Sequence, residues 1–181
     1  GGEVIQEGGE VTGVLIDNAM DLVYNVMPKL SREQSIQALK DAQDYCFDYG
    51  LTTVNDAGLD RNTILLIDSL QKAGTLEMRM YAMISNTAAD VDYFIENGIL
   101  KTEKLNVRSV KVYGDGALGS RGAALRAPYS DRHNHYGAMV TPVDSIYSLA
   151  KKLAKTDFQM NTHAIGDSAN TVILNAYAEA L

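Results

Sequence analysis

Short apolar strands alternate with helices through most of this 181-residue chain. The strands are expected near residues 51–54, 78–84, 107–113 and 158–163. Between them, apolar residues recur at helical spacing, and three of the expected helices end near Gly50, Gly74 or Gly98. Strands that alternate with helices every 30 residues or so (about the length of one βαβ unit) are typical of parallel sheets. The sequence therefore predicts an α/β fold built from parallel β/α units.

The clearest helix start is a capping box at Ser31, where Gln34 stands three residues later. In such a box the serine hydroxyl and the glutamine side chain each bind a backbone N–H of the other residue. Ahead of it, residues 1–30 are glycine-rich at first and predict a short strand or an extended arm near 12–16. We expect residues 1–30 to be an extended N-terminal segment belonging to a barrel insertion.

Residues 31–181 are expected to form part of a TIM (β/α)8 barrel, with parallel strands about two to five and their helices. Short strands with polar residues at their carboxyl ends suit a barrel better than an open doubly wound sheet. A closed barrel needs eight strands and about 250 residues, so four strands predict a partial barrel, incomplete at both ends. The start at Gly1 and the end at Leu181, inside an expected helix, favour a fragment.

Charge and hydropathy exclude some classes of partner. The net charge is -7 at pH 7, and an acidic surface argues against nucleic acid, whose phosphates need a basic face. No apolar run approaches the roughly 20 residues of a membrane span. The single cysteine rules out an internal disulfide bond. The expectation is a cytoplasmic protein that binds neither nucleic acid nor a membrane.

Two strand ends carry ionisable residues followed by Gly-Asp loops. Lys111 lies within one apolar strand, ahead of Gly114 and Asp115, and His163 ends another, ahead of Gly166 and Asp167. In a parallel β/α fold the carboxyl ends of the strands converge on one face, which is where catalytic groups lie. Lys111 and His163 are therefore candidate catalytic or metal-binding residues.

Each candidate also has a structural interpretation. Lys111 could extend to solvent from a strand edge, or act as a base, form a Schiff base, or be carboxylated and bridge two metal ions. His163 could be a structural histidine or a ligand. Asp167 could cap the following helix or orient a ligand. The pair His133 and His135 stands in a polar stretch that is typical of a surface loop.

A long motif in this chain is similar to that of a known family. The residues that carry it are Lys111-Val-Tyr-Gly-Asp-Gly-Ala-Leu-Gly-Ser-Arg-Gly-Ala-Ala-Leu125, Pro128-Tyr-Ser-Asp131 and Asn161-Thr-His-Ala-Ile-Gly-Asp167. They resemble the YtcJ-like branch of the amidohydrolase superfamily, amidohydrolase family 3. The resemblance implies a metal-dependent hydrolase that breaks non-peptide, amide-like C–N bonds with metal-activated water.

The resemblance also implies roles for particular residues. His163 would fall at the metal-ligand position of strand five, and Lys111 at the strand-four position that often carries a carboxylated lysine. Asp115 and Arg121 would border the substrate, although Arg121 could equally order its own loop. Asp167 would orient a metal ligand without binding the metal itself. One or two divalent metal ions, expected to be zinc, would bind the full-length protein and need not be retained by this chain.

The family's strand-one H-x-H, strand-six histidine and strand-eight aspartate have no match in this chain. We therefore expect the isolated chain to be inactive and the full-length protein to act on a small amide-like molecule. The alternative is a non-catalytic or metal-free α/β domain in which Lys111 and His163 are structural. Strands two and five would have exposed edges, which predicts a homo-oligomer or self-association through those edges.

Overall fold

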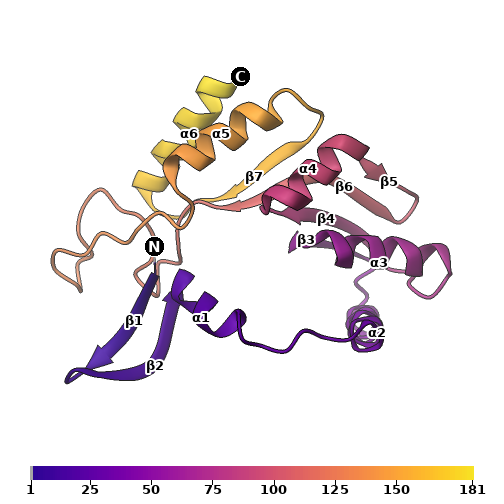
Figure 1. Ribbon diagram of the computed structural model, residues 1–181, viewed down its shortest axis with the longest axis horizontal. Coiled ribbons are helices and arrows are strands. Elements are labelled where there is room, and N and C mark those ends of the chain that lie inside the picture. Colours follow the sequence, from indigo (N-terminus) through magenta and orange to yellow (C-terminus); the bar gives the residue numbers. More distant parts are fainter. Residues whose placement is uncertain (1) are drawn as a thin grey trace. The chain divides into compact units, whose positions relative to one another are not determined.

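The computed structural model describes residues 2–181, and the chain divides into two compact units (Figure 1). The first unit combines Gly1–Met27, Val112–Lys155 and Thr162–Leu181. The second unit combines Pro28–Lys111 and Thr156–Asn161. Each unit therefore joins segments that are far apart in the sequence.

The second unit is built around a mainly parallel sheet. The strands of this sheet are β3 (Thr53–Leu59), β4 (Arg79–Ser85), β5 (Leu100–Lys101), β6 (Leu105–Tyr113) and β7 (Gln159–His163). The last two residues of β6 and of β7 belong to the first unit. The order is β3-β4-β6-β5, and β7 pairs with β6. The pairs β3–β4 and β4–β6 are parallel. The expected parallel β/α fold is confirmed, and the arrangement agrees with part of a TIM barrel. The two-residue β5, antiparallel to β6, is an addition that the sequence did not predict.

Helices of the second unit begin and end close to the expected residues. They are α2 (Arg32–Asp48), α3 (Arg61–Lys72) and α4 (Ala88–Asn97). Both α3 and α4 pack against β4 (Figure 1). The fully buried side chains of Ile64, Ile67 and Ile84, with Phe94 at 2% exposed, form this core. Helix α2 joins it through Ile36 and Leu39, which pack on a cluster of buried leucines from α3 and the turn after it.

The capping box at the start of α2 is confirmed. The Gln34 N–H donates to the Ser31 hydroxyl at 3.2 Å, and the Ser31 N–H donates to Gln34 Oε1 at 2.8 Å. At the other end, Gly50 has φ 73°, a left-handed conformation that glycine adopts without strain. Local signals therefore define both ends of this helix.

The first unit begins with a hairpin where a single short strand or an extended arm was expected. Strands β1 (Gly2–Glu7) and β2 (Glu10–Asp17) pair antiparallel. Gly8 and Gly9 form the turn with φ 61° and 88°, and two successive positive φ values are what a tight hairpin turn needs. A short 3-10 turn, η1 (Asn18–Met20), and the single-turn helix α1 (Asp21–Tyr24) follow.

Two helices complete the first unit. Helix α5 (Val143–Leu153) packs against α6 (Asp167–Ala180) (Figure 1). The buried residues are Ile146, Ala150 and Leu153 in α5 and Ala169, Ile173 and Ala176 in α6. None of the helices in residues 2–181 has the length and hydropathy needed to cross a bilayer.

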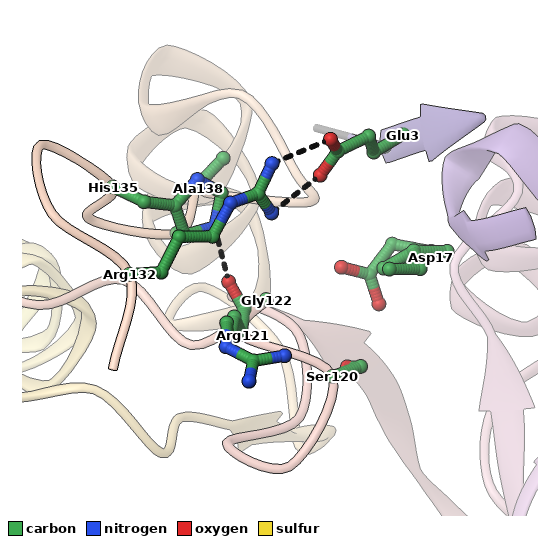
Figure 2. A pocket seen from close by; sticks show the side chains of 11 residues that line it. Glu3, Asp17, Ser120, Arg121, Gly122, Arg132, His135 and Ala138 are labelled. Carbon is green, nitrogen blue, oxygen red and sulfur yellow. Dashed lines mark hydrogen bonds and ion pairs between the residues drawn. The ribbon is translucent and has the colours of Figure 1, made fainter. Parts of the chain in front are cut away.

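An ion pair fastens the hairpin to the loop that follows β6. The Arg132 guanidinium donates two hydrogen bonds to the Glu3 carboxylate, at 2.9 and 2.7 Å (Figure 2). Paired N–H donors fix the orientation of both side chains as well as their distance. Through these bonds Arg132 lowers the pKa of Glu3 below its ordinary value.

Replacing the cap residue of α2 should destabilise the fold. We expect Ser31→Ala to reduce the free energy of unfolding by about 1 kcal/mol, because a backbone N–H of the first turn loses its acceptor. Urea unfolding measures the change. Lys40→Ala, an exposed substitution in the same helix, is the control and should change the midpoint little; equal midpoints for both variants would contradict this role of Ser31.

The Glu3–Arg132 pair should give a pH-dependent contribution to stability. Because the pKa of Glu3 is lower when folded than when unfolded, the contribution is present above the unfolded pKa and is lost as the pH falls through the folded pKa. The melting temperature of the unsubstituted protein should exceed that of Glu3→Gln at pH 7. The difference should be small, since the pair is partly exposed, and should shrink on acidification. Glu10→Gln, on the same hairpin, should show no such trend.

Candidate active site

The loops that follow β6 and β7 are joined by one buried carboxylate. Asp115 is 1% exposed. Its Oδ2 accepts hydrogen bonds from the N–H groups of Ala124 and Gly166, both at 2.8 Å, and its Oδ1 accepts from the Ile165 N–H at 2.9 Å. Three N–H donors satisfy the charge of a carboxylate in a buried position. Asp115 thus holds the two loops in a fixed relation.

His163 lies beside this junction. Its Nε2 atom is 3.9 Å from Asp115 Oδ1, which is too long for a hydrogen bond, and its side chain is 29% exposed. The rings of His163 and Tyr113 lie 5.8 Å apart between centroids. The His163 carbonyl accepts a hydrogen bond from the Gly114 N–H at 2.8 Å. The backbone and the neighbouring ring therefore orient an imidazole that solvent still reaches.

A cavity of about 490 Å³ opens next to His163. Tyr113, Asp115 and His163 line it, together with Ala117 and Val140. The volume suits a small molecule. The structure therefore brings two of the predicted site residues, Asp115 and His163, to one concave surface.

The other two predicted residues of the first unit have partners of their own. Arg121 donates to the Asp131 carboxylate from Nε at 3.2 Å and from Nη2 at 2.7 Å. Asp167 Oδ1 accepts a hydrogen bond from the Arg126 N–H at 2.9 Å. The pairing with Asp131 supports the interpretation in which Arg121 orders its own loop. The hydrogen bond to Asp167 anchors the backbone at Arg126. A substrate contact for Arg121 stays a prediction.

Lys111 belongs to the second unit. It lies in β6, in register with Ser85 of β4. Its side chain is partly buried, and burial lowers the pKa of Lys111 because desolvation disfavours the charged amine. A Cβ atom built on Gly58 would come within 3.9 Å of Lys111 Cγ, so the lysine stem packs near the end of β3.

The H-x-H pair lies in a loop, as expected. His135 makes a 2.8 Å hydrogen bond between its Nε2 and the carbonyl of Arg121, and its ring lies 5.7 Å from that of Tyr129. His133 is exposed. His135 therefore helps to shape the 121–135 loop from a pocket-facing position (Figure 2).

A complete metal site is not formed by the part of the chain that the structure describes. Within residues 2–181, no group of three or more His, Cys, Asp or Glu side chains converges as a metal site requires. Asp115, the carboxylate nearest His163, already accepts three backbone hydrogen bonds. His163 is thus a candidate metal ligand, and residues 2–181 do not supply the other ligands of a complete site.

Asp17 lines the same cavity and was missed by sequence reasoning. It ends β2 with φ 50°. The one signal in the sequence was an acidic residue directly after the apolar run Val14–Ile16, which is common in loops. Its neighbours in space, Gly116 and Gly122, are about a hundred residues away in sequence, so no local pattern pointed to it.

Replacing the buried carboxylate should be costly. Asp115→Asn keeps the shape but puts an NH₂ group where an oxygen accepts backbone N–H groups. We expect the free energy of unfolding to fall by roughly 3 kcal/mol, since bonds to a charged acceptor are strong and an unmet buried donor is penalised. Chemical denaturation measures the loss. Asp157→Asn, an exposed substitution, is the matched control; a similar small change in both variants would refute this role.

Comparison with known proteins shows the family of this chain. The model of the amidohydrolase family matches residues 1–181. Protein LONG AFTER FAR-RED 3 of Arabidopsis thaliana is 30% identical over 98% of this chain and 33% of its own length. YtcJ of Bacillus subtilis (strain 168), which carries the name of an amidohydrolase, is 30% identical over 97% of this chain and 34% of its own length.

A solved structure has the same fold. An uncharacterised metal-dependent hydrolase from Pyrococcus furiosus superposes with a TM-score of 0.75 and 25% identity, covering 90% of this chain and 34% of that one. The chain thus spans about a third of the length of the relatives it matches. The family model matches the whole chain, and membership of that family accounts for both the long motif after β6 and the fold. The chain belongs to the amidohydrolase family.

Proposed function

We propose that the full-length protein is a metal-dependent hydrolase of non-peptide, amide-like C–N bonds, and that this chain supplies part of its active site. The observation that carries the proposal is the solvent-accessible His163 imidazole, held beside a small-molecule cavity by the Asp115 junction. Membership of the amidohydrolase family and the hydrolase name of the Pyrococcus relative support it.

His163 is proposed to bind a divalent metal ion, with zinc as the expected ion. A bound metal would supply activation of water and polarisation of the substrate carbonyl. Lys111, if carboxylated, would provide a second ligand group, and its lowered pKa favours the neutral amine that carboxylation needs. The remaining ligands would come from residues outside this chain, so the isolated chain is expected to be inactive.

Asp115 is proposed to act as a positioning residue. It is buried and accepts three backbone hydrogen bonds, so it holds the loop after β7 and thereby the direction of the His163 ring. Arg121 would influence the substrate through the shape of its loop, because its guanidinium is paired with Asp131. Asp167 would support the same region through the Arg126 backbone.

The alternative is a non-catalytic or metal-free α/β domain in which Lys111 and His163 are structural. The lack of a three-residue ligand cluster within residues 2–181 is compatible with it. Self-association through an open sheet edge, such as that of β3, and a cytoplasmic location stay predictions.

Metal content separates the two functions. We expect the full-length protein to contain about one or two zinc-like ions per chain. His163→Ala and Lys111→Ala should each lower that content and the hydrolysis of simple amides, because each removes a proposed ligand. Elemental analysis of the purified proteins is the measurement.

The matched control is His133→Ala, an exposed histidine in the loop after β6, which should keep both metal and activity. A parent protein without metal, or equal metal content in all three variants, would favour the metal-free alternative.

A further inference from the structure

The cavity beside His163 has a second side that the proposed function does not use. That side is made by the segment at the end of the N-terminal hairpin, which contributes Asp17, Asn18, Met20, Asp21 and Tyr24. Asn18 fixes this segment to the loop after β6, since its Nδ2 donates to the Val140 carbonyl at 3.2 Å. The hairpin is therefore a wall of the His163 cavity.

Asp17 is held in an unusual position in this wall. Its backbone has φ 50° and ψ -127°, a conformation that a residue with a side chain rarely adopts. Its carboxylate lies against Gly116 and Gly122, and a Cβ atom built on either glycine would come within 2.3 Å of Asp17 Oδ2. Two glycines of the motif after β6 are thus required by the space that the Asp17 carboxylate fills.

The Asp17 carboxylate has no charged partner among residues 2–181. Among the described residues no hydrogen bond or ion pair reaches it, and Figure 2 shows it turned toward the 120–122 loop, in a smaller pocket that Arg121 and Arg132 also line. The nearby arginines are already committed, Arg132 to Glu3 and Arg121 to Asp131. A partly buried carboxylate without a partner is costly to keep, and a cationic ligand would relieve that cost.

The composition of the cavity agrees with a cationic ligand. No lysine or arginine lines it, whereas Asp17 and Asp21 bring negative charge and Tyr24 and Tyr113 bring aromatic rings. Asp115 contributes less acceptor capacity than Asp17, because three backbone N–H groups already donate to it. Carboxylates and aromatic rings together bind an ammonium group, whereas a ligand carboxylate would be repelled.

We propose that this cavity receives the amine half of the substrate and that Asp17 binds the ammonium ion that hydrolysis releases from it. The inference rests on the proposed function. In hydrolysis of an amide-like bond, water adds its oxygen to the acyl carbon, the C–N bond breaks, and the nitrogen takes the proton that water gives up. An alkylamine released in this way is protonated at neutral pH, because the pKa of such an amine is about 10. Asp17 stabilises the resulting ammonium ion.

The Glu3–Arg132 pair positions Asp17. Glu3 is in β1, opposite Ile16 in the hairpin register, next to Asp17. Through its two hydrogen bonds to Arg132, the hairpin is anchored on the same loop that carries Gly122 (Figure 2). The Asp17 carboxylate is therefore held from two sides. Gly116 and Gly122 lie against it, and the Glu3–Arg132 ion pair anchors the hairpin that carries it.

Binding of three molecules of matched shape to the full-length protein tests the proposal without turnover. The probes are cyclohexylammonium, cyclohexanol and cyclohexanecarboxylate, measured by calorimetry or saturation-transfer NMR. We expect the ammonium to bind about tenfold more tightly than the alcohol and the carboxylate to bind most weakly, as one unpaired charge in a partly enclosed site implies. Asp17→Asn, which keeps size and shape, should remove the ammonium preference and leave alcohol binding unchanged.

Glu10→Gln is the matched control, because it removes one negative charge from the far end of the same hairpin, and it should keep the preference. Equal binding of the ammonium and the carboxylate by the unsubstituted protein, or an undiminished preference in Asp17→Asn, would overturn the proposal. If Asp17→Asn fails to fold, the order of the three probes in the unsubstituted protein still decides. Failure to hydrolyse any amide would count against the proposed function alone, since no probe is turned over.

Discussion

The first unit depends on a single buried carboxylate. Asp115 accepts N–H groups from the loop after β6 and from the loop after β7, so two segments about 50 residues apart share one acceptor group. Because three backbone N–H groups donate to its oxygens, Asp115 holds both loops in place, and its contact with a substrate stays a prediction. Its chemistry is to make the His163 position reproducible, and a fixed position is what catalysis requires of a ligand or base.

Close packing around Asp115 also explains the glycines of the long motif after β6. The run from Lys111 to Leu125 carries few side chains that reach the cavity, and much of it serves packing. Gly116 and Gly122 leave room for the Asp17 carboxylate, and Gly114 lies where a Cβ atom would come within 2.7 Å of the His163 carbonyl oxygen. Close backbone and side-chain contacts leave no room for a Cβ atom at these positions, which is a structural reason for the glycines of the motif.

Local signals in the sequence predicted the helices and strands well, since capping at Ser31 and the positive φ at Gly50 depend only on neighbouring residues. The N-terminal hairpin was predicted less well, because β1 has little alternation and is held by Arg132, far away in sequence. His163 was found from its place at a strand end. The roles of Asp115 and Asp17 could not be predicted, because both depend on contacts between distant segments.

The N-terminal hairpin and the loop after β6 form one functional element, although about a hundred residues separate them. Asp17 needs the glycines, the glycine loop carries Arg132, and Arg132 holds Glu3 beside Asp17. A change at any member of this closed set alters the wall of the His163 cavity. His163 and Asp115 are proposed to act near the reacting bond, and the hairpin on the group attached to it. Two regions that lie far apart in the sequence therefore line one cavity.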